Sequence, residues 1–279
     1  MNFLDSLLHP CKTGASVLSL IGVSTKSVLQ ALGGMMWMTR ETMSEIIERV
    51  ATGRAPLSRE HFFYQCNRVG VGSIPMIILL SVFVGLTMAL LTGYQLQRFG
   101  LVTLVPAIVS VSFTREMGPL FTGIVLASRI GAAYTAELGA MKANGEVDAI
   151  EAMGIGPLGY LVTPRLLSIF TLTVCLSVVS VIAGIAGAAF ISNLMLQLGF
   201  EYFLEQVMTN LLVKDVTAGI VKSFLFGGLI GIIACYKGLS VRGGAVGVGV
   251  ATTSSVVTSI SSVIACDSIC NIFIVTFFP

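Results

Sequence analysis

The sequence contains few charged residues. Only 11% of its 279 residues are Asp, Glu, Lys or Arg, whereas 55% are hydrophobic and the mean hydropathy is +0.93. A chain of this composition has too little polar surface to cover a water-soluble globule. Its basic residues are scattered, and a net charge of +2 forms no patch that could hold nucleic acid. The sequence therefore predicts an all-α polytopic membrane protein without a nucleic-acid partner.

The sequence also lacks the cysteine spacing of disulfide frameworks and zinc sites. None of its six cysteines forms a CxxC pair. Cys266 and Cys270 lie one helical turn apart and could supply half a metal site, but only Asp267 lies near them as a further ligand. Packing as small apolar side chains is the favoured interpretation. We therefore expect no metal and no cofactor.

No GxxxxGK[ST] phosphate loop occurs in the chain, so any ATP hydrolysis would take place in another protein. The glycine-rich string at 243–249 contains no lysine, and close helix contact explains it better. The sequence shows no Ser/His/Asp set, because His9 and His61 both lie in the N-terminal segment. We expect a chain that is not an enzyme and has no catalytic residues.

Long charge-free runs characterise the chain from residue 61 to its last residue, 279. Residues 69–97, 166–200 and 243–266 contain no charged side chain, and about 20 apolar residues suffice to cross a bilayer. Two further runs are interrupted only by Arg115-Glu116 and by Lys222. The sequence predicts a transmembrane domain at 61–279 with about five transmembrane helices, at about 69–97, 101–128, 166–197, 215–236 and 247–275.

Residues 1–60 form a separate N-terminal segment in this interpretation. The first part is apolar but interrupted by His9, Lys12 and Lys26, and it lacks the basic region and cleavage site of a signal peptide. Such a stretch is typical of an amphipathic helix that lies in the membrane interface. In residues 41–52, apolar residues fall on one face of a helix and charged residues on the other, which predicts a surface helix.

Basic residues collect on one side of the predicted spans. Seven Lys or Arg residues precede the first span, Lys142 and Arg165 are assigned to the loop after span two, and two more lie in the loop after span four, whereas the other side holds only Arg98 and Lys214. Short loops rich in Lys and Arg stay in the cytoplasm. The distribution predicts a cytoplasmic N-terminus and a periplasmic C-terminus. The lack of a Ser- and Arg-rich transit peptide favours a bacterial inner membrane.

Charged residues at membrane depth indicate a function or a structural ion pair. A charge at the bilayer centre costs about 2.5–3.5 kcal/mol on insertion scales, so Arg115 and Glu116 are expected to face a protein interior or a wet cavity. Adjacent helical residues point about 100° apart, so at least one of the two needs another partner. A lipid phosphate would suit Arg115. Arg129 is expected to reach toward the nearby end of its helix.

Residues 143–154 are predicted to form a short cytoplasmic helix. Val147, Ile150 and Met153 lie along one side at helical spacing. The acidic residues of this segment are presented outward: Glu146, Asp148 and Glu151. This pattern occurs in helices that dock on a partner protein and also in ordinary solvated helices.

Five segments, taken in order, carry a resemblance to a known family. They are REMGPLFTGIVLASRIGAAYTAELGAMK at 115–142, EVDAIEAMGI at 146–155, VTPR at 162–165, KSFLFGGLIGIIACYKG at 222–238 and GGAVGVGVATTSSVV at 243–257. Together they resemble the MlaE/YrbE permease family, which supplies the transmembrane subunits of ABC transporters that work with MCE-domain lipid carriers. The resemblance covers roughly residues 60 to 270.

The resemblance implies a mechanism and a set of partners. The 143–154 segment would be the coupling helix that sits in a groove of a separate P-loop ATPase, which gives a role to Glu146, Asp148, Glu151 and Met153. Two copies of the chain would form a homodimer whose first, second and fifth spans line a phospholipid pocket, with Arg115 and Glu116 as candidate lipid-binding residues. An MCE-domain lipid-binding protein would be a further partner. Ser254 stands where the family usually has a basic residue, and Gly145 begins the coupling helix.

Two other classes of function remain open. A secondary transporter could use Arg115, Glu116 and Lys222 as an ion or proton relay, although the chain shows no pair of matching halves. An intramembrane lipid-modifying enzyme could use Glu116 or Asp267 as a base, although no nucleophile lies at helical spacing from either.

Overall fold

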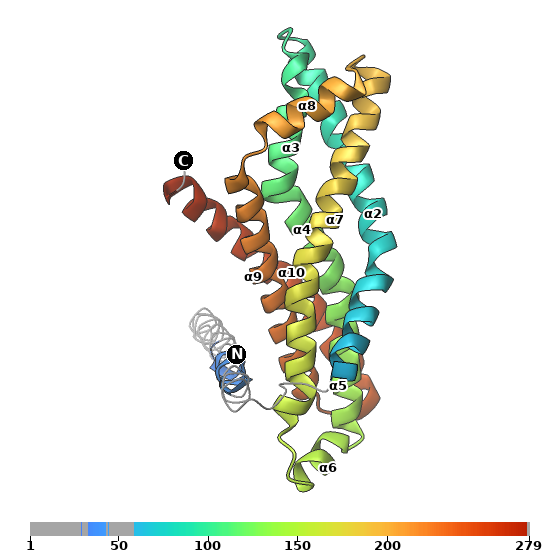
Figure 1. The fold of residues 1–279 in the computed structure, drawn as a ribbon. Helices are drawn as coiled ribbons and strands as arrows, with labels where there is room; N and C mark the ends of the chain where they lie inside the picture. The colour runs from blue at the N-terminus through green and yellow to red at the C-terminus, as the bar shows by residue number, and fades with distance from the viewer. Residues whose placement is uncertain (1–28, 30–32, 43, 45–58, 278–279) are drawn as a thin grey trace, which may run out of the picture.

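The structure is a computed structural model that describes residue 29, residues 33–42, residue 44 and residues 59–277. In this part of the chain every regular element is a helix, and the long helices run side by side as a bundle (Figure 1). The interfacial helix predicted within residues 1–60 and the surface helix at 41–52 fall largely outside the described residues. The prediction of an all-α polytopic architecture is confirmed.

The helices follow one another with short connections. In chain order they are α2 (Arg59–Gln97), the 3₁₀ turn η1 (Val102–Leu104), α3 (Val105–Ser112), the π turn η2 (Phe113–Met117), α4 (Gly118–Leu126), the π turn η3 (Ala127–Gly131), α5 (Ala132–Ala143), α6 (Glu146–Ala152), the π turn η4 (Leu158–Val162), α7 (Thr163–Met195), α8 (Phe200–Asn210), α9 (Val213–Leu239) and α10 (Gly244–Phe277). Residues 33–42, which precede α2, are also helical.

Four helical stretches are each long and apolar enough to cross a membrane: Phe63–Gln97, Leu158–Met195, Val213–Leu239 and Gly244–Ile274. The span predicted at 101–128 is a run of shorter segments, α3, η2, α4 and η3, joined end to end. At η2 the N–H of Gly118 donates to the carbonyl of Phe113, five residues back. Pro119 follows and has no N–H of its own, so the regular ladder cannot continue through this point. The irregular turn therefore falls on Arg115 and Glu116.

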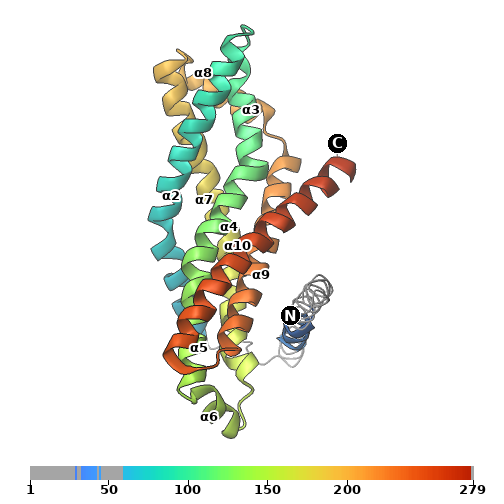
Figure 2. The same ribbon diagram turned by 180° about the vertical axis from the view of Figure 1, so that it is seen from behind.

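The bundle has two distinct ends. The short helix α6 lies at one end and α8 lies at the other, while α10 crosses the bundle obliquely (Figures 1 and 2). We call these the α6 end and the α8 end. The sequence analysis missed α8, although Phe200, Phe203, Leu204 and Val207 follow helical spacing. Phe203 and Val207 are buried, so this helix covers the α8 end of the bundle.

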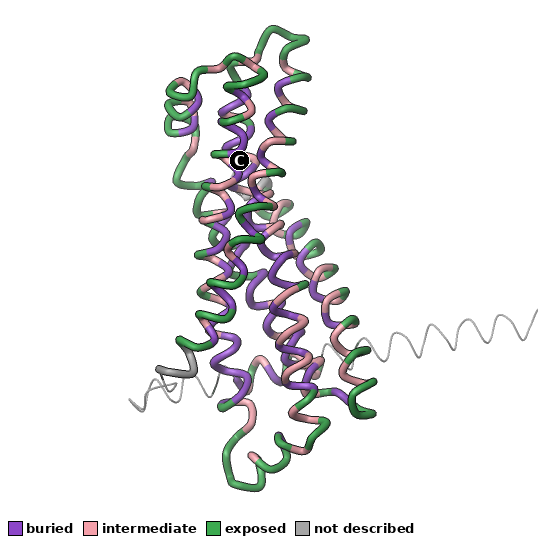
Figure 3. Tube along the Cα trace, turned by 90° about the vertical axis from the view of Figure 1, so that its right-hand side faces the viewer, coloured by how far each residue is buried: buried purple, intermediate pink, exposed green. Residues whose placement is uncertain are grey.

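Glycines allow the two most extensively packed helices, α2 and α7, to approach closely. A side chain at Gly85 would overlap the backbone of Gly184, and one at Gly187 would overlap the backbone of Val82. Gly184 in turn leaves room for the buried ring of Phe113. Small residues serve this purpose in membrane helices because close backbone contact supplies the van der Waals attraction. Figure 3 shows buried residues along the inside of the bundle and exposed ones on its outer faces.

The close contact predicts an effect of a single methyl group. Gly85→Ala is expected to push α2 from α7 and to destabilise the protein by about 1–3 kcal/mol, as for overpacking in a dense core. The measurement is the thermal unfolding temperature in mild detergent. Gly249→Ala is the matched control, because nothing lies within 4 Å of the added carbon there. Equal unfolding temperatures for the two variants would contradict the packing.

Candidate functional site

A buried lysine forms the centre of a polar network inside the bundle. Lys222 of α9 has a side chain that is only 1% exposed. Its Nζ donates to Glu116 Oε2 at 2.7 Å and lies 3.1 Å from Asp267 Oδ1. Asn271 Oδ1 accepts a second hydrogen bond from the same ammonium group. Lys222 is therefore held by two hydrogen bonds and by the ion pair with Asp267, as a buried cation requires.

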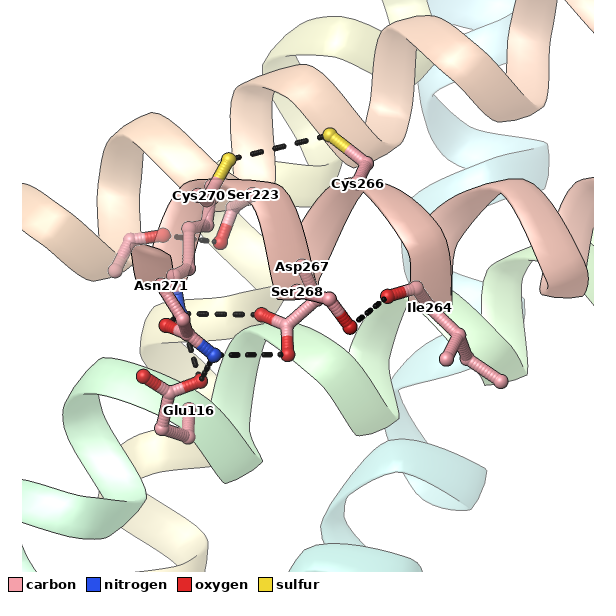
Figure 4. A network of polar contacts seen from close by, with 10 residues as sticks. Glu116, Ser223, Ile264, Cys266, Asp267, Ser268, Cys270 and Asn271 are labelled. Atoms are coloured by element: carbon pink, nitrogen blue, oxygen red, sulfur yellow. Dashed lines mark hydrogen bonds and ion pairs between the residues drawn. The ribbon is translucent and has the colours of Figure 1, made fainter. Parts of the chain in front are cut away.

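The acceptors converge because of helical spacing. Asp267 and Asn271 lie four residues apart on α10 and so occupy the same face. The Asn271 Nδ2 donates to Glu116 Oε2 at 3.0 Å and to Asp267 Oδ2 at 3.3 Å (Figure 4). The amide thus joins the two carboxylates that share Lys222. The network connects three elements, η2, α9 and α10, at membrane depth.

Arg115 finds a different partner from its neighbour. Its Nη1 lies 3.5 Å from Asp215 Oδ1 on α9, and the Asp215 side chain is only 4% exposed. Asp215 also accepts the backbone N–H of Leu212 at 3.1 Å and so caps the start of α9. As the sequence analysis required, Arg115 and Glu116 do not pair with each other. Both instead pair with α9, one through Asp215 and one through Lys222.

The two predicted lipid-binding residues form the accessible part of this network. The side chains of Arg115 and Glu116 are 27% and 30% exposed, whereas Lys222 is sealed inside. In their ionised forms the three carboxylates of Glu116, Asp215 and Asp267 outnumber the two cations. The site can therefore present one cation and one anion to a polar group, with a fixed polar layer behind them.

The predicted coupling residues lie far from this network, at the α6 end (Figure 1). Gly145 precedes α6 with a φ of 77°, a conformation that other residues rarely adopt, which explains the glycine at this position. Glu146 and Asp148 occupy the first turn, and Asp148 accepts from Lys142 at 2.6 Å. Glu151 and Met153 are exposed. Within α6 only Val147 is buried, so most of the helix surface is open.

A second set of ion pairs lies where α2, α5 and α7 approach α6. Glu137 Oε2 accepts from Arg68 at 2.7 Å, and its Oε1 lies 3.0 Å from Arg165 Nη2. The Arg165 guanidinium lies 5.9 Å from the centre of the Tyr134 ring. Arg165 was predicted to lie in the loop between the second and third spans, and this network was not predicted. Hydropathy could not reveal it, since the three charges come from separate helices.

Two positions singled out from the sequence have ordinary local partners. Ser254 on α10 accepts from Lys237 Nζ at 3.0 Å, so a lysine from α9 reaches the position where a basic residue was expected. The sulfurs of Cys266 and Cys270 lie 4.0 Å apart (Figure 4). Among the described residues there is no group of three or more His, Cys, Asp or Glu side chains that could hold a metal.

The long apolar helices and the charged residues held between them define a polytopic helical membrane protein. The family model described as Permease MlaE matches residues 62–273. A probable ABC transporter permease, slr1045 of Synechocystis, is 32% identical over 84% of this chain and 87% of its own length. The probable ABC transporter permease RT0041 of Rickettsia typhi is 32% identical over 88% of this chain and 92% of its own length.

A further relative is TRIGALACTOSYLDIACYLGLYCEROL 1, chloroplastic, of Arabidopsis thaliana, which is 29% identical over 82% of this chain and 65% of its own length. The chain belongs to the MlaE permease family, and the resemblance seen in the sequence is confirmed. It is a multi-pass membrane protein of the permease type.

The network predicts that Lys222 is essential to the fold. Lys222→Met leaves Glu116 and Asp267 without their shared cation, and breaking a buried pair from one side costs about 3–5 kcal/mol. The yield of folded protein and its unfolding temperature in detergent are the measurements. The triple variant Lys222→Met with Glu116→Gln and Asp267→Asn is expected to recover much of the loss, because no buried charge then remains unpaired. No recovery would show that the loss does not come from the unpaired carboxylates of Glu116 and Asp267.

Proposed function

We propose that this chain is the transmembrane permease subunit of an ABC-type lipid transporter of the Mla/MCE type, with phospholipid as cargo. Two copies form the lipid cavity as a homodimer, and a separate P-loop ATPase supplies the energy. An MCE-domain protein exchanges lipid with the permease. The chain itself catalyses no reaction.

The polar network at membrane depth is the observation that carries this proposal. Ionised side chains inside a bilayer are expensive and are kept where they meet a polar substrate or a wet cavity. Behind the surface, Asn271 forms hydrogen bonds with both Lys222 and Asp267. Arg115 and Glu116 remain partly exposed. An exposed cation beside an exposed anion complements a phospholipid head group, whose phosphate pairs with Arg115. The name of the Arabidopsis relative, which is that of a glycerolipid, supports a lipid cargo.

The exposed elements support the partners. Only 11% of the most apolar 18-residue stretch of α10 is buried inside the chain. This helix nevertheless crosses the bundle and carries two residues of the network, Asp267 and Asn271. A second copy that packs on α10 would cover this face and enclose the site. At the α6 end, Glu146, Glu151 and Met153 are open to a partner, which fits a coupling helix in an ATPase groove.

The proposed location is the inner membrane of a bacterium, with the α6 end in the cytoplasm. The N-terminus lies on the cytoplasmic side and the C-terminus on the periplasmic side. This orientation puts α6 within reach of a cytoplasmic ATPase, and it agrees with the excess of Lys and Arg in the segments on that side.

Lipid binding is tested at the cationic end of the site. Arg115→Ala is expected to reduce the phospholipid that co-purifies with the chain, while the dimer and the α9 contacts of Lys222 remain. The measurement is mass spectrometry of bound lipids from the protein in mild detergent. Arg98→Ala is the control, since Arg98 is exposed and bonds to Tyr94 outside the network. Unchanged lipid occupancy in Arg115→Ala would favour a purely structural ion pair with Asp215.

Coupling to the ATPase is tested at α6. Glu151→Lys reverses the charge of an exposed residue and is expected to weaken capture of a P-loop ATPase from the native membrane by tenfold or more, as for loss of an interfacial charge contact. Glu205→Lys on α8 makes the same charge change at the opposite end. Normal recovery of the ATPase with Glu151→Lys would count against the docking role. Lipid transport driven by an ion gradient without ATP would favour the relay alternative instead.

A further inference from the structure

Arg129 is a cation within the helical bundle that has no polar partner among the described residues. It lies in the π turn η3, between the apolar helix α4 and the start of α5. Its guanidinium donates no hydrogen bond to, and forms no ion pair with, any residue that the structure describes. This contrasts with Arg115, whose guanidinium lies beside Asp215. An arginine has five N–H donors, and in a bilayer such donors require an acceptor.

The guanidinium of Arg129 lies against a bare stretch of α2. A side chain at Gly72 would overlap Arg129 Nη2 and would come within 3.1 Å of its Cζ. A side chain at this position would therefore displace the guanidinium, which is the flexible end of the Arg129 side chain. The nitrogens of Arg129 are absent from the fully buried polar atoms that lack a partner, so none of them is sealed inside the protein. Arg129 therefore lies against α2 on one side and is accessible on another.

The surroundings of Gly72 suit a lipid. Val71 is 63% exposed and Met76 is 50% exposed on the same helix, so apolar surface adjoins the cation. Along the helical run of α4 and α5, Arg129 lies eight residues, or roughly 12 Å, from Glu137 toward the bundle middle. It lies about 21 Å from Arg115 on the same path. The two arginines thus occupy different depths, with Arg129 nearer the α6 end.

We propose that Arg129 binds the phosphate of a lipid head group from the leaflet at the α6 end, as a station separate from the Arg115 site. The inference rests on the proposed lipid-transport function and extends it. A planar guanidinium pairs with two phosphate oxygens at once, and the exposed side chains of Val71 and Met76 contact the acyl chains. A lipid that enters from this leaflet meets Arg129 first and the Arg115–Glu116 site second.

The test measures phospholipid binding by the full chain in mild detergent. The purified protein is titrated with phosphatidylglycerol, and bound lipid is counted by native mass spectrometry. Arg129→Gln is expected to weaken the apparent affinity of one phosphatidylglycerol per chain by roughly tenfold or more, as for a lost hydrogen bond to a charged group. Gly72→Ala, which moves the guanidinium but keeps its charge, is expected to weaken the same binding event. Arg98→Gln is the matched control.

Two further probes identify the ligand. Diacylglycerol lacks the phosphate, so its binding is expected to be the same in the wild type and in Arg129→Gln. Inorganic phosphate at millimolar concentration is expected not to displace the lipid, and displacement would mean that the site takes free phosphate. Arg129→Lys retains the charge and tests folding, since its unfolding temperature is expected to match that of the wild type.

The outcomes separate this inference from the function on which it rests. If Arg129→Gln and Arg98→Gln bind phosphatidylglycerol equally while Arg115→Ala loses it, the Arg129 station is wrong and the lipid function stands. If the wild-type chain binds no phospholipid at all, the proposed function fails first. A loss in Arg129→Gln that Gly72→Ala does not share would mean that the position beside α2 plays no part.

Discussion

The ion pairs of Lys222 constrain the whole arrangement of the bundle. An ammonium group that is 1% exposed has no water to hold it, so its acceptors must come from the protein. Glu116 comes from η2, and Asp267 and Asn271 come from α10, so a single side chain of α9 fixes the distances among three elements. Apolar contacts in lipid are interchangeable and define position poorly. Directional contacts to a buried charge define it well.

The irregular helix between residues 105 and 143 follows from the same requirement, that charged side chains inside the bundle have polar partners. A regular α-helix repeats every 3.6 residues, and a π turn adds a residue that rotates the following side chains. The two π turns of this stretch carry three of its five charged residues, Arg115 with Glu116 in η2 and Arg129 in η3. The turns let the charges point at α9 and at α2, while the apolar residues between them keep their contacts with the core. Polar placement and apolar packing are thus both satisfied.

Sequence alone predicted what depends on local composition. The long spans follow from runs such as 69–97 because charge-free length decides whether a helix can cross a bilayer. The need for separate partners of Arg115 and Glu116 followed from helical geometry, but the identity of those partners did not. Asp267 and Lys222 are distant in sequence, and only the crossing of α9 and α10 brings them together. Arg165 was misplaced for the same reason, since its burial depends on Glu137.

The two polar networks differ in how easily they can rearrange. Arg68 and Glu137 are 39% and 31% exposed, so water can replace either partner at small cost. Lys222 is sealed, and separating its ammonium group from its acceptors would cost several kcal/mol. A displacement that begins at α6 reaches the partly exposed Arg68–Glu137 pair of α2 and α5 first. Motion is therefore expected to open the α6 end, while η2, α9 and α10 move together as one unit around Lys222.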